Sequence, residues 1–227
     1  MRNIIYHSVF RFCRFCARCF TPRYRVCPPN VTVTPVVYVV HHQNLRGPII
    51  SMVWFNKPIR PWVLSVFCDQ NTCFRQFYDY TFTKRFRMPK VIAAVIAFPL
   101  SFCVSGLMHW IRAIPVFRGS KAIVKTFRQS ISALTEGQSL LICPDIEYTD
   151  TGSSMNEMYH GFLDLEKNYR KQTNRHLAFV PLHISESKHC IHIGEAIYFN
   201  TGDDIRSEKI RVFDCLKQEF SRLESSE

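Results

Sequence analysis

The chain has 227 residues, of which 47% are hydrophobic, which suits one sizeable domain, or one domain with an appendage, and excludes a largely disordered chain. The net charge of +11 is uneven, because residues 1–90 hold 14 Lys and Arg against only Asp69 and Asp79, whereas the remainder holds 15 basic and 16 acidic residues. This asymmetry predicts an anionic partner, and a membrane surface is preferred to nucleic acid because the sequence contains no RNA-binding motif, zinc finger or convincing helix-turn-helix.

The first 20 residues, MRNIIYHSVFRFCRFCARCF, predict an amphipathic helix. Arg11, Arg14 and Arg18 follow one another at helical spacing. A second, apolar stripe comprises Ile5, Val9, Phe12, Cys16 and Phe20. Two interpretations remain open: an interfacial membrane helix, or a helix packed on its own domain with its arginines in water. We expect residues 1–30 to be a basic amphipathic membrane-associating segment and residues 31–227 to be an α/β domain.

The ten cysteines are expected to be reduced thiols. The N-terminus has no uninterrupted apolar segment and no small-residue cleavage site, so a cytoplasmic location is expected. Cys13, Cys16, Cys19 and Cys27 fit an iron–sulfur run poorly, because the last gap is seven residues where the common bacterial pattern has about three. No metal is therefore assigned to these cysteines.

The run Val36–Val40 predicts a buried strand, and it ends in His41 and His42. Gly47 and Pro48 follow a short polar stretch and are expected at the N-cap and first turn of a helix. Further on, residues 91–108 form an 18-residue apolar run that contains Pro99. This length is at the lower limit for a membrane span, so a buried or partly membrane-dipping helix is favoured over a transmembrane one.

Strands and helices alternate in the second half of the chain. Strands are expected at Ile114–Phe117, Ser139–Cys143, Leu177–Ile184 and Cys190–Phe199. Helices are expected between Ser120 and Gly137, at Glu157–Thr173 and at Ile205–Leu223. This alternation predicts an α/β fold with a single sheet covered by helices, preceded by the N-terminal amphipathic helix.

Several strand ends carry polar residues where α/β folds bind ligands. His41 and His42 follow the first strand, Arg118 follows the strand from Ile114, and Asp145 and Glu147 follow the strand from Ser139. We expect a base, a cation and a carboxylate to meet at one sheet edge. A second histidine group, near Cys190, comprises His183, His189 and His192. It is interpreted as the polar faces of strands, because nothing in the sequence fixes a second pair of metal ligands.

The order of these blocks resembles the glycerophospholipid acyltransferase family, whose best-known members acylate 1-acylglycerol-3-phosphate. The family's first block is an apolar strand, Asn-His, four residues and Asp, and VVYVVHHQNLRG places His42 at the histidine. IPVFRGS supplies the arginine of the second block as Arg118. CPDI matches the third block, Phe-Pro-Glu-Gly, loosely, with Asp145 at the acidic position, and FVPLHI supplies the proline of the fourth as Pro181. The resemblance covers about residues 31–199.

The resemblance implies transfer of a fatty acyl group from an acyl carrier protein or coenzyme A thioester to the hydroxyl of a lysophospholipid. It implies His42 as the general base and Asp145 as an acid that positions the acceptor or the base. The implied substrate-binding residues are Arg118, for a phosphate, Gly119, Pro144 and Glu147. No metal or bound redox cofactor is expected, and the enzyme is expected at the cytoplasmic face of a membrane.

Two motif positions depart from the family's pattern. The family's aspartate falls on Gly47, and the glycine of the third block falls on Ile146. A backbone carbonyl or another acid would then have to orient His42. The alternative is a non-catalytic lipid-binding relative with the same fold, in which His42 is a polar loop residue and Arg118 forms an ordinary ion pair with Asp145.

Overall fold

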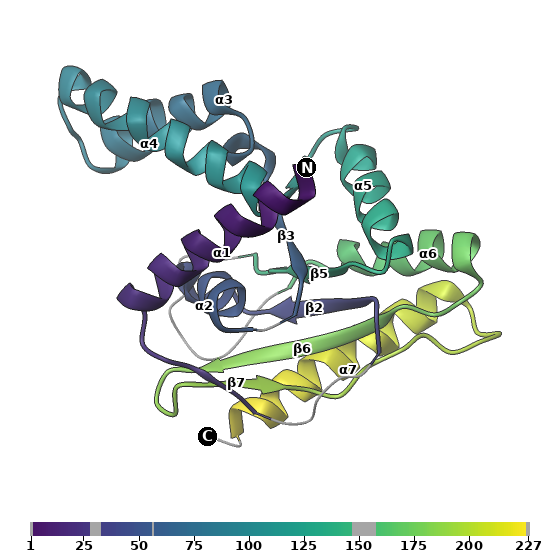
Figure 1. Ribbon diagram of the computed structural model, residues 1–227. Helices are drawn as coiled ribbons and strands as arrows, with labels where there is room; N and C mark the ends of the chain where they lie inside the picture. Colours follow the sequence, from purple (N-terminus) through teal and green to yellow (C-terminus); the bar gives the residue numbers. More distant parts are fainter. Residues whose placement is uncertain (1, 28–32, 56, 147–157, 226–227) are drawn as a thin grey trace. The chain divides into compact units, whose positions relative to one another are not determined.

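A computed structural model describes residues 2–27, 33–55, 57–146 and 158–225 of the chain (Figure 1). The chain forms two compact units: unit 1 comprises Met1–Phe10 and Arg60–Gln129, and unit 2 comprises Arg11–Ile59 and Ser130–Glu227. The predicted division into a membrane-associating segment, residues 1–30, and a domain, residues 31–227, stays a prediction.

Unit 2 contains a five-stranded sheet built around β2 (Val36–Val40). Its neighbours, β5 (Ser139–Ile142) and β6 (Ala178–Ser185), both run parallel to it. β7 (Cys190–Ile193) pairs with β6 in antiparallel orientation, and β1 (Arg25–Cys27) pairs with β7 in parallel. The strand order in this unit is β1-β7-β6-β2-β5. The predicted α/β fold is confirmed.

Continuous apolar runs explain the central strands, because parallel strands covered on both faces need apolar side chains on both. Every residue of β2 is fully buried. α7 (Ile205–Ser225) runs along β6 (Figure 1) and buries Val212 and Leu216. α2 (Arg46–Trp54) adds Ile50 to the core cluster that contains β2. This unit also contains α6 (Leu165–Thr173), the end of α1 (Arg2–Phe20) and the end of α5 (Ile123–Thr135).

Two arginines of α1 bind the C-terminal end of α2. Arg14 donates through Nε to Val53 O at 2.6 Å and through Nη2 to Phe55 O at 2.7 Å, and Arg18 Nε donates to Val53 O at 3.1 Å. The Arg18 guanidinium also lies 5.0 Å from the centre of the Trp54 ring. Helix C-termini attract cations because their last carbonyls lack helical donors. Burial, with the nearby charge of Arg18, lowers the pKa of Arg14.

These contacts correct one part of the second interpretation of the N-terminal helix, because Arg14 and Arg18 donate to backbone carbonyls of Val53 and Phe55. The membrane interpretation stays a prediction. Large aromatic side chains of the same helix are exposed: Phe12 by 67%, Phe15 by 65% and Phe20 by 88%. An apolar surface therefore remains on α1, whereas part of its basic stripe is used to dock the helix.

Unit 1 contains a parallel pair of strands, β3 (Ile59–Leu64) and β4 (Ile114–Val116), joined by a helical segment. That segment comprises α3 (Gln70–Arg75), a π-helix (Gln76–Arg85) and α4 (Lys90–Trp110), which pack on one another. Aromatic contacts hold them together; Phe74, for example, stacks on Tyr78 with ring centres 5.5 Å apart.

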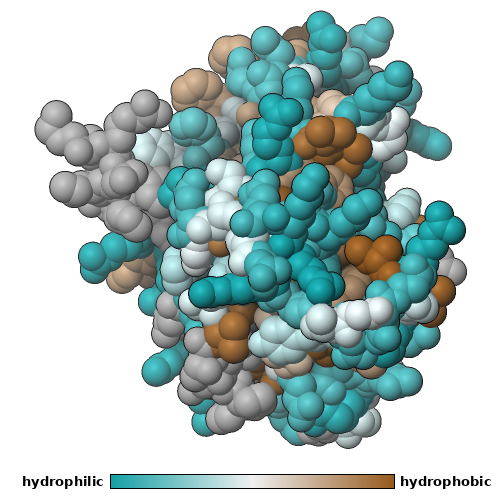
Figure 2. Space-filling view, turned by 90° about the vertical axis from the view of Figure 1, so that its right-hand side faces the viewer, coloured by the Kyte–Doolittle hydropathy of each residue, from teal (hydrophilic) through white to brown (hydrophobic). Residues whose placement is uncertain are grey.

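α4 carries the apolar run that the sequence analysis singled out. It is long and apolar enough to cross a membrane by length and composition, and only 17% of its 18-residue apolar window is buried. Its buried residues are the small Ala93, Ala97 and Ser101, whereas Val95 and Phe102 are each 69% exposed. The alternative of a buried helix is therefore wrong. By contrast, the face drawn in Figure 2 is largely hydrophilic, with hydrophobic residues in small separate patches.

Some predicted boundaries differ from the observed ones. The helix expected at Glu157–Thr173 begins only at Leu165 as α6, after a 3₁₀ turn. Met158 instead forms an isolated antiparallel bridge with Asp145. The strand from Cys190 is four residues long instead of ten, although Ile197 forms a further isolated bridge.

The expectation that all cysteines are free is also wrong. Cys27 on β1 and Cys190 on β7 are joined by a disulfide, although they are 163 residues apart in the sequence. The other eight cysteines are not disulfide-bonded.

Candidate active site

The carboxyl ends of β2 and β5 meet at one edge of the sheet. The strands are parallel, with Val39 opposite Ile142, so the chain leaves both in the same direction. His41 follows β2 directly, and Asp145 comes three residues after β5. The bridge between Asp145 and Met158 holds the backbone at this position.

A buried carboxylate binds the two histidines. Asp145 Oδ1 contacts His41 Nδ1, and Asp145 Oδ2 accepts a 3.0 Å hydrogen bond from the backbone N–H of His42. The side chains of His41 and Asp145 are only 6% and 2% exposed. A carboxylate is tolerated at this depth because each of its oxygens has a donor.

The carboxylate determines which nitrogen of His41 carries the proton. An ionised carboxylate only accepts hydrogen bonds, so Nδ1 of His41 must donate, and in the neutral ring the lone pair is then on Nε2. His41 Nε2 is buried and has no hydrogen-bond partner among the residues that the structure describes. A buried polar atom of this kind calls for a ligand or a catalytic explanation. With an ionised Asp145, the neutral ring of His41 therefore presents an unprotonated Nε2.

In His42 the roles of the two ring nitrogens are reversed. Its Nδ1 accepts a 3.2 Å hydrogen bond from the backbone N–H of Leu45 and so caps the 3₁₀ turn Gln43–Leu45. In the neutral ring the proton is then on Nε2. The sequence analysis assigned the base to His42, and that role stays a prediction. Of the two rings, it is His41 whose hydrogen bond to the carboxylate leaves the Nε2 lone pair available.

The turn after His42 has a strained backbone. Gln43, Asn44 and Leu45 have φ values of 45°, 49° and 78°, a left-handed region that costs non-glycine residues on the order of 1 kcal/mol each. Gln43 is also buried, and its Oε1 has no hydrogen-bond partner within the described ranges. Strain and unpaired polar atoms are concentrated at functional sites in proteins, where the surroundings hold them in place.

Gly47 has no room for a side chain. A Cβ at this position would lie 1.8 Å from His41 O and 3.0 Å from the carbonyl carbon of the same residue. The aspartate of the family's first block could not stand here without moving the backbone. The expectation that Gly47 is the N-cap is also wrong, because α2 begins at Arg46 and Leu45 takes the N-cap position.

The other predicted site residues are distributed over both units. Pro144 is buried directly before Asp145 in unit 2. Arg118 and Gly119 follow β4 in unit 1, where both are exposed. Glu147 lies outside the described residues. The substrate-binding roles of these four residues stay predictions.

The sequence analysis gave no catalytic role to His41. The meeting of β2 and β5 could be expected, but the contact of one histidine with Asp145 depends on the turn after β2. Left-handed φ values at three non-glycine residues have no sequence signature. One sequence feature could have indicated the pair: Gly47 has no carboxylate to orient a histidine, so another acid is needed, and Asp145 after β5 is a candidate.

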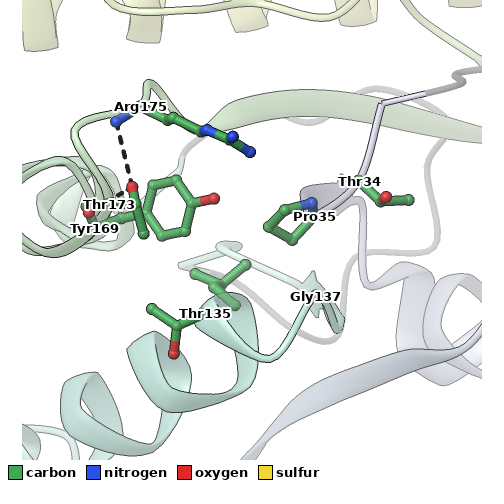
Figure 3. Close-up of a pocket in the computed structure, with 8 residues that line it drawn as sticks. Thr34, Pro35, Thr135, Gly137, Tyr169, Thr173 and Arg175 are labelled. Carbon is green, nitrogen blue, oxygen red and sulfur yellow. Dashed lines mark hydrogen bonds between the residues drawn. The ribbon is translucent and has the colours of Figure 1, made fainter.

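A shallow hollow of about 360 Å³ lies at the other end of the strands (Figure 3). Thr34 and Pro35 line it before the start of β2, Gly137 before the start of β5, and Tyr169 and Thr173 from α6. Because His41 and Asp145 follow the carboxyl ends of the same strands, this hollow is not part of the candidate active site.

Comparisons with known proteins agree with the fold. The chain matches no protein-family model and no curated protein sequence. A solved structure similar to it is that of the 1-acyl-sn-glycerophosphate (LPA) acyltransferase PlsC from Thermotoga maritima, with a TM-score of 0.56 and 11% sequence identity. The match covers 99% of this chain and 83% of that chain. At this identity the likeness shows that the two chains share a fold.

Proposed function

We propose that this protein transfers a fatty acyl group from an acyl thioester to the hydroxyl of a lysophospholipid, with His41 as the general base and Asp145 as the carboxylate that orients it. The observation that carries the proposal is the buried His41–Asp145 pair, which leaves the Nε2 lone pair available. The acyltransferase fold supports the reaction type.

The proposed reaction needs only a base and its orienting acid. Nε2 of His41 takes the proton of the acceptor hydroxyl as the oxygen attacks the thioester carbonyl. When the tetrahedral intermediate collapses, the C–S bond breaks and the leaving thiolate receives the proton from the imidazolium. Asp145 stabilises that imidazolium while it exists. The products are an ester and a free thiol, so neither a metal nor a redox cofactor takes part.

The proposed substrates are an acyl carrier protein or coenzyme A thioester and an acceptor such as 1-acylglycerol-3-phosphate. The PlsC structure is named for an acceptor of this kind. Arg118 is proposed to bind the acceptor phosphate, because a guanidinium pairs with two phosphate oxygens at once. Gly119, Pro144 and Glu147 are proposed to complete the substrate-binding site.

We also propose that the protein binds the cytoplasmic face of an anionic membrane, peripherally or by shallow insertion. Exposed Phe12, Phe15 and Phe20 on α1 and Val95 and Phe102 on α4 support this proposal. Each basic residue near an anionic surface contributes about 1 kcal/mol to membrane binding. Apolar side chains that insert at the interface add to this attraction.

Acyl transfer measured with the purified chain, both thioester donors and 1-acylglycerol-3-phosphate tests the function. His41→Ala is expected to lower kcat by about 10²–10⁴-fold, the usual contribution of a general base. His42→Ala is expected to retain most of the activity, because the hydrogen bond to Asp145 uses the backbone of His42. His176→Ala is a matched control, since His176 pairs with Glu166 at 2.7 Å in a second histidine–carboxylate contact.

The reverse result, an inactive His42→Ala with an active His41→Ala, would return the base to His42. The second candidate function, lipid binding without catalysis, is favoured by the exposed apolar surface of α4, which does not depend on the His41–Asp145 pair. It takes the place of the enzyme proposal if the wild type binds lysophospholipid but is inactive with every donor and acceptor.

Vesicle flotation tests the membrane proposal. The double variant Val95→Ser/Phe102→Ser is expected to bind anionic vesicles at least about tenfold more weakly, because it removes exposed apolar area. Ile210→Ser is the matched control on α7, where Ile210 is 65% exposed. Equal binding by all three proteins would contradict insertion of α4.

A further inference from the structure

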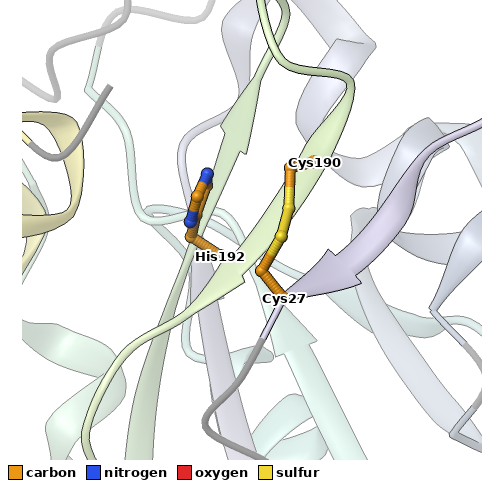
Figure 4. Close-up of side chains that lie close together, drawn as sticks. All are labelled: Cys27, Cys190 and His192. Atoms are coloured by element: carbon orange, nitrogen blue, oxygen red, sulfur yellow. A yellow bond between two sulfur atoms is a disulfide. The ribbon is translucent and has the colours of Figure 1, made fainter.

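Three potential metal ligands lie together on neighbouring strands of unit 2. Cys27 comes from β1, and Cys190 and His192 come from β7 (Figure 4). Their ligand atoms all lie within 4.8 Å of one another. In a tetrahedral zinc site the ligand atoms are separated by about 3.5–4 Å, so the two sulfur atoms, which are bonded to each other in the structure, would have to separate to hold an ion with His192.

The strand register explains why these side chains meet. Cys27 is opposite His192 in the parallel β1–β7 ladder, and Cys190 lies two residues before His192. Residues that are opposite one another, or two apart on one strand, project from the same face of a sheet. The cluster is therefore a consequence of the ladder itself.

A fourth ligand is available on the next strand. His183 on β6 is opposite His192 in the antiparallel ladder, and their ring centres are 6.2 Å apart. Two imidazoles on one tetrahedral zinc have ring centres about 5 Å apart. The two rings would have to approach by about 1 Å to reach this spacing, and His183 would then complete a site of two thiolates and two imidazoles across β1, β7 and β6.

We infer that Cys27, Cys190 and His192, completed by His183, bind a zinc ion when the two thiols are reduced. Cysteine and histidine are the ligands that structural zinc sites prefer, and four protein ligands make a closed site that holds the metal without catalysis. The disulfide in the structure is the oxidised form of the same pair of residues. Each form joins the short strand β1 to β7.

The sequence analysis assigned no metal to these residues because it could not find a second ligand pair. The second thiol, Cys27, is 163 residues away from Cys190. Cys27 was considered only with Cys13, Cys16 and Cys19, its neighbours in sequence. The site becomes visible once β1 is placed beside β7 at the edge of the sheet.

Zinc binding to the purified, full-length chain tests the inference. The chain is reduced with a phosphine under anaerobic conditions, the free thiols are counted, and Zn²⁺ is titrated against a chromogenic chelator. One zinc ion per chain is expected, and Co²⁺ in its place is expected to give the absorption bands of tetrahedral thiolate coordination. Two protons are expected to leave the thiols on binding.

Variants separate the metal site from a disulfide. Cys27→Ser and His192→Ala are expected to weaken zinc binding by at least about 100-fold, since even partners of the ligands cost 10–100-fold. His183→Ala is expected to leave a weaker, three-ligand site. Cys27→His is expected to retain zinc binding although it can form no disulfide with Cys190. Cys103→Ser, at an exposed free cysteine, is the matched control and is expected to bind like the wild type.

Two results would overturn the inference. The first is no zinc binding by wild-type chain whose thiols are all shown to be reduced, which would leave Cys27 and Cys190 as a disulfide pair only. The second is undiminished binding by both Cys27→Ser and His192→Ala, which would place the metal elsewhere. Circular dichroism of each variant shows whether it is folded, so that a loss of binding can be assigned to the site.

Discussion

Asp145→Asn is expected to remove acyl transfer with little change in the shape of the site. The carboxylate has two acceptor oxygens and faces two donors, His41 Nδ1 and the backbone N–H of His42. An amide offers one acceptor oxygen and one NH₂ group. The N–H of His42 can only donate, so the amide oxygen must face it and the NH₂ group must face His41 Nδ1. That nitrogen must then accept, which moves the ring proton of His41 to Nε2 and removes the lone pair of the base.

The magnitude follows from this tautomer change. In serine proteases the same substitution of the orienting aspartate lowers kcat by about 10⁴, because the histidine adopts the wrong tautomer, and that factor corresponds to about 5 kcal/mol of transition-state stabilisation. If the amide turned the other way, its NH₂ group would face the His42 N–H and two buried donors would lack an acceptor, each at a cost of about 1–3 kcal/mol. The orientation with the amide oxygen toward the His42 N–H is therefore favoured.

Two measurements test this reasoning independently. Nitrogen-15 NMR of the imidazoles is expected to show His41 protonated on Nδ1 in the wild type and on Nε2 in Asp145→Asn, whether or not the assay contains the right substrate. The rate of acyl transfer is expected to fall in parallel. Asp164→Asn is the matched control, because Asp164 is exposed and pairs with Lys209 at 2.7 Å. A wild-type His41 protonated on Nε2, or a variant that keeps more than about a tenth of the rate, would refute the argument.

Two further predictions concern stability. Gly47→Ala is expected to destabilise unit 2 by about 3 kcal/mol or more in urea unfolding, because its Cβ would lie 1.8 Å from His41 O. Gly106→Ala is the control and is expected to be neutral or stabilising, because no neighbouring atom lies within 4 Å of its Cβ. Equal effects of the two substitutions on stability would contradict the packing argument. The hydrogen bond from Arg211 lowers the pKa of Glu208 from 4.5 to about 2. The ionised Glu208 therefore stabilises the folded state fully above pH 4.5, and this stabilisation is lost as the pH falls toward 2. The difference in urea midpoint between wild type and Glu208→Gln is expected to shrink over that pH range, and a constant difference would contradict it.

The elements that sequence predicted well are those with local signals. Ser120 and Gly137 bound the helix α5 (Ile123–Thr135) as expected: Ser120 Oγ accepts from Ala122 N–H at 2.9 Å, and Gly137 has a φ of 78°. The apolar runs of β2, β5 and β6 likewise require burial on both faces. β1 was not predicted, because three residues with a polar start have no periodicity, and only pairing with β7 makes them a strand.

The candidate active site was predictable in its location but not in its pairing. Strand ends in a parallel sheet place the histidines and Asp145 at one edge, and that much follows from the order of elements. The choice between His41 and His42 depends on hydrogen bonds made by the turn, above all the Leu45 N–H bond to His42 Nδ1. Neither residue type nor spacing contains that information, since both side chains are imidazoles in adjacent positions.

The departure at Gly47 and the pairing of His41 with Asp145 have one structural explanation. With no side chain at position 47, the start of α2 packs directly on the carbonyl of His41, so a carboxylate for the imidazole must come from another element. The end of β5 supplies Asp145. Adjacent side chains leave the backbone in different directions, so a carboxylate that approaches from β5 meets a different histidine from one that approaches from α2. Under the proposed function, a glycine at position 47 therefore predicts that the base is His41 instead of His42, with Asp145 as its carboxylate.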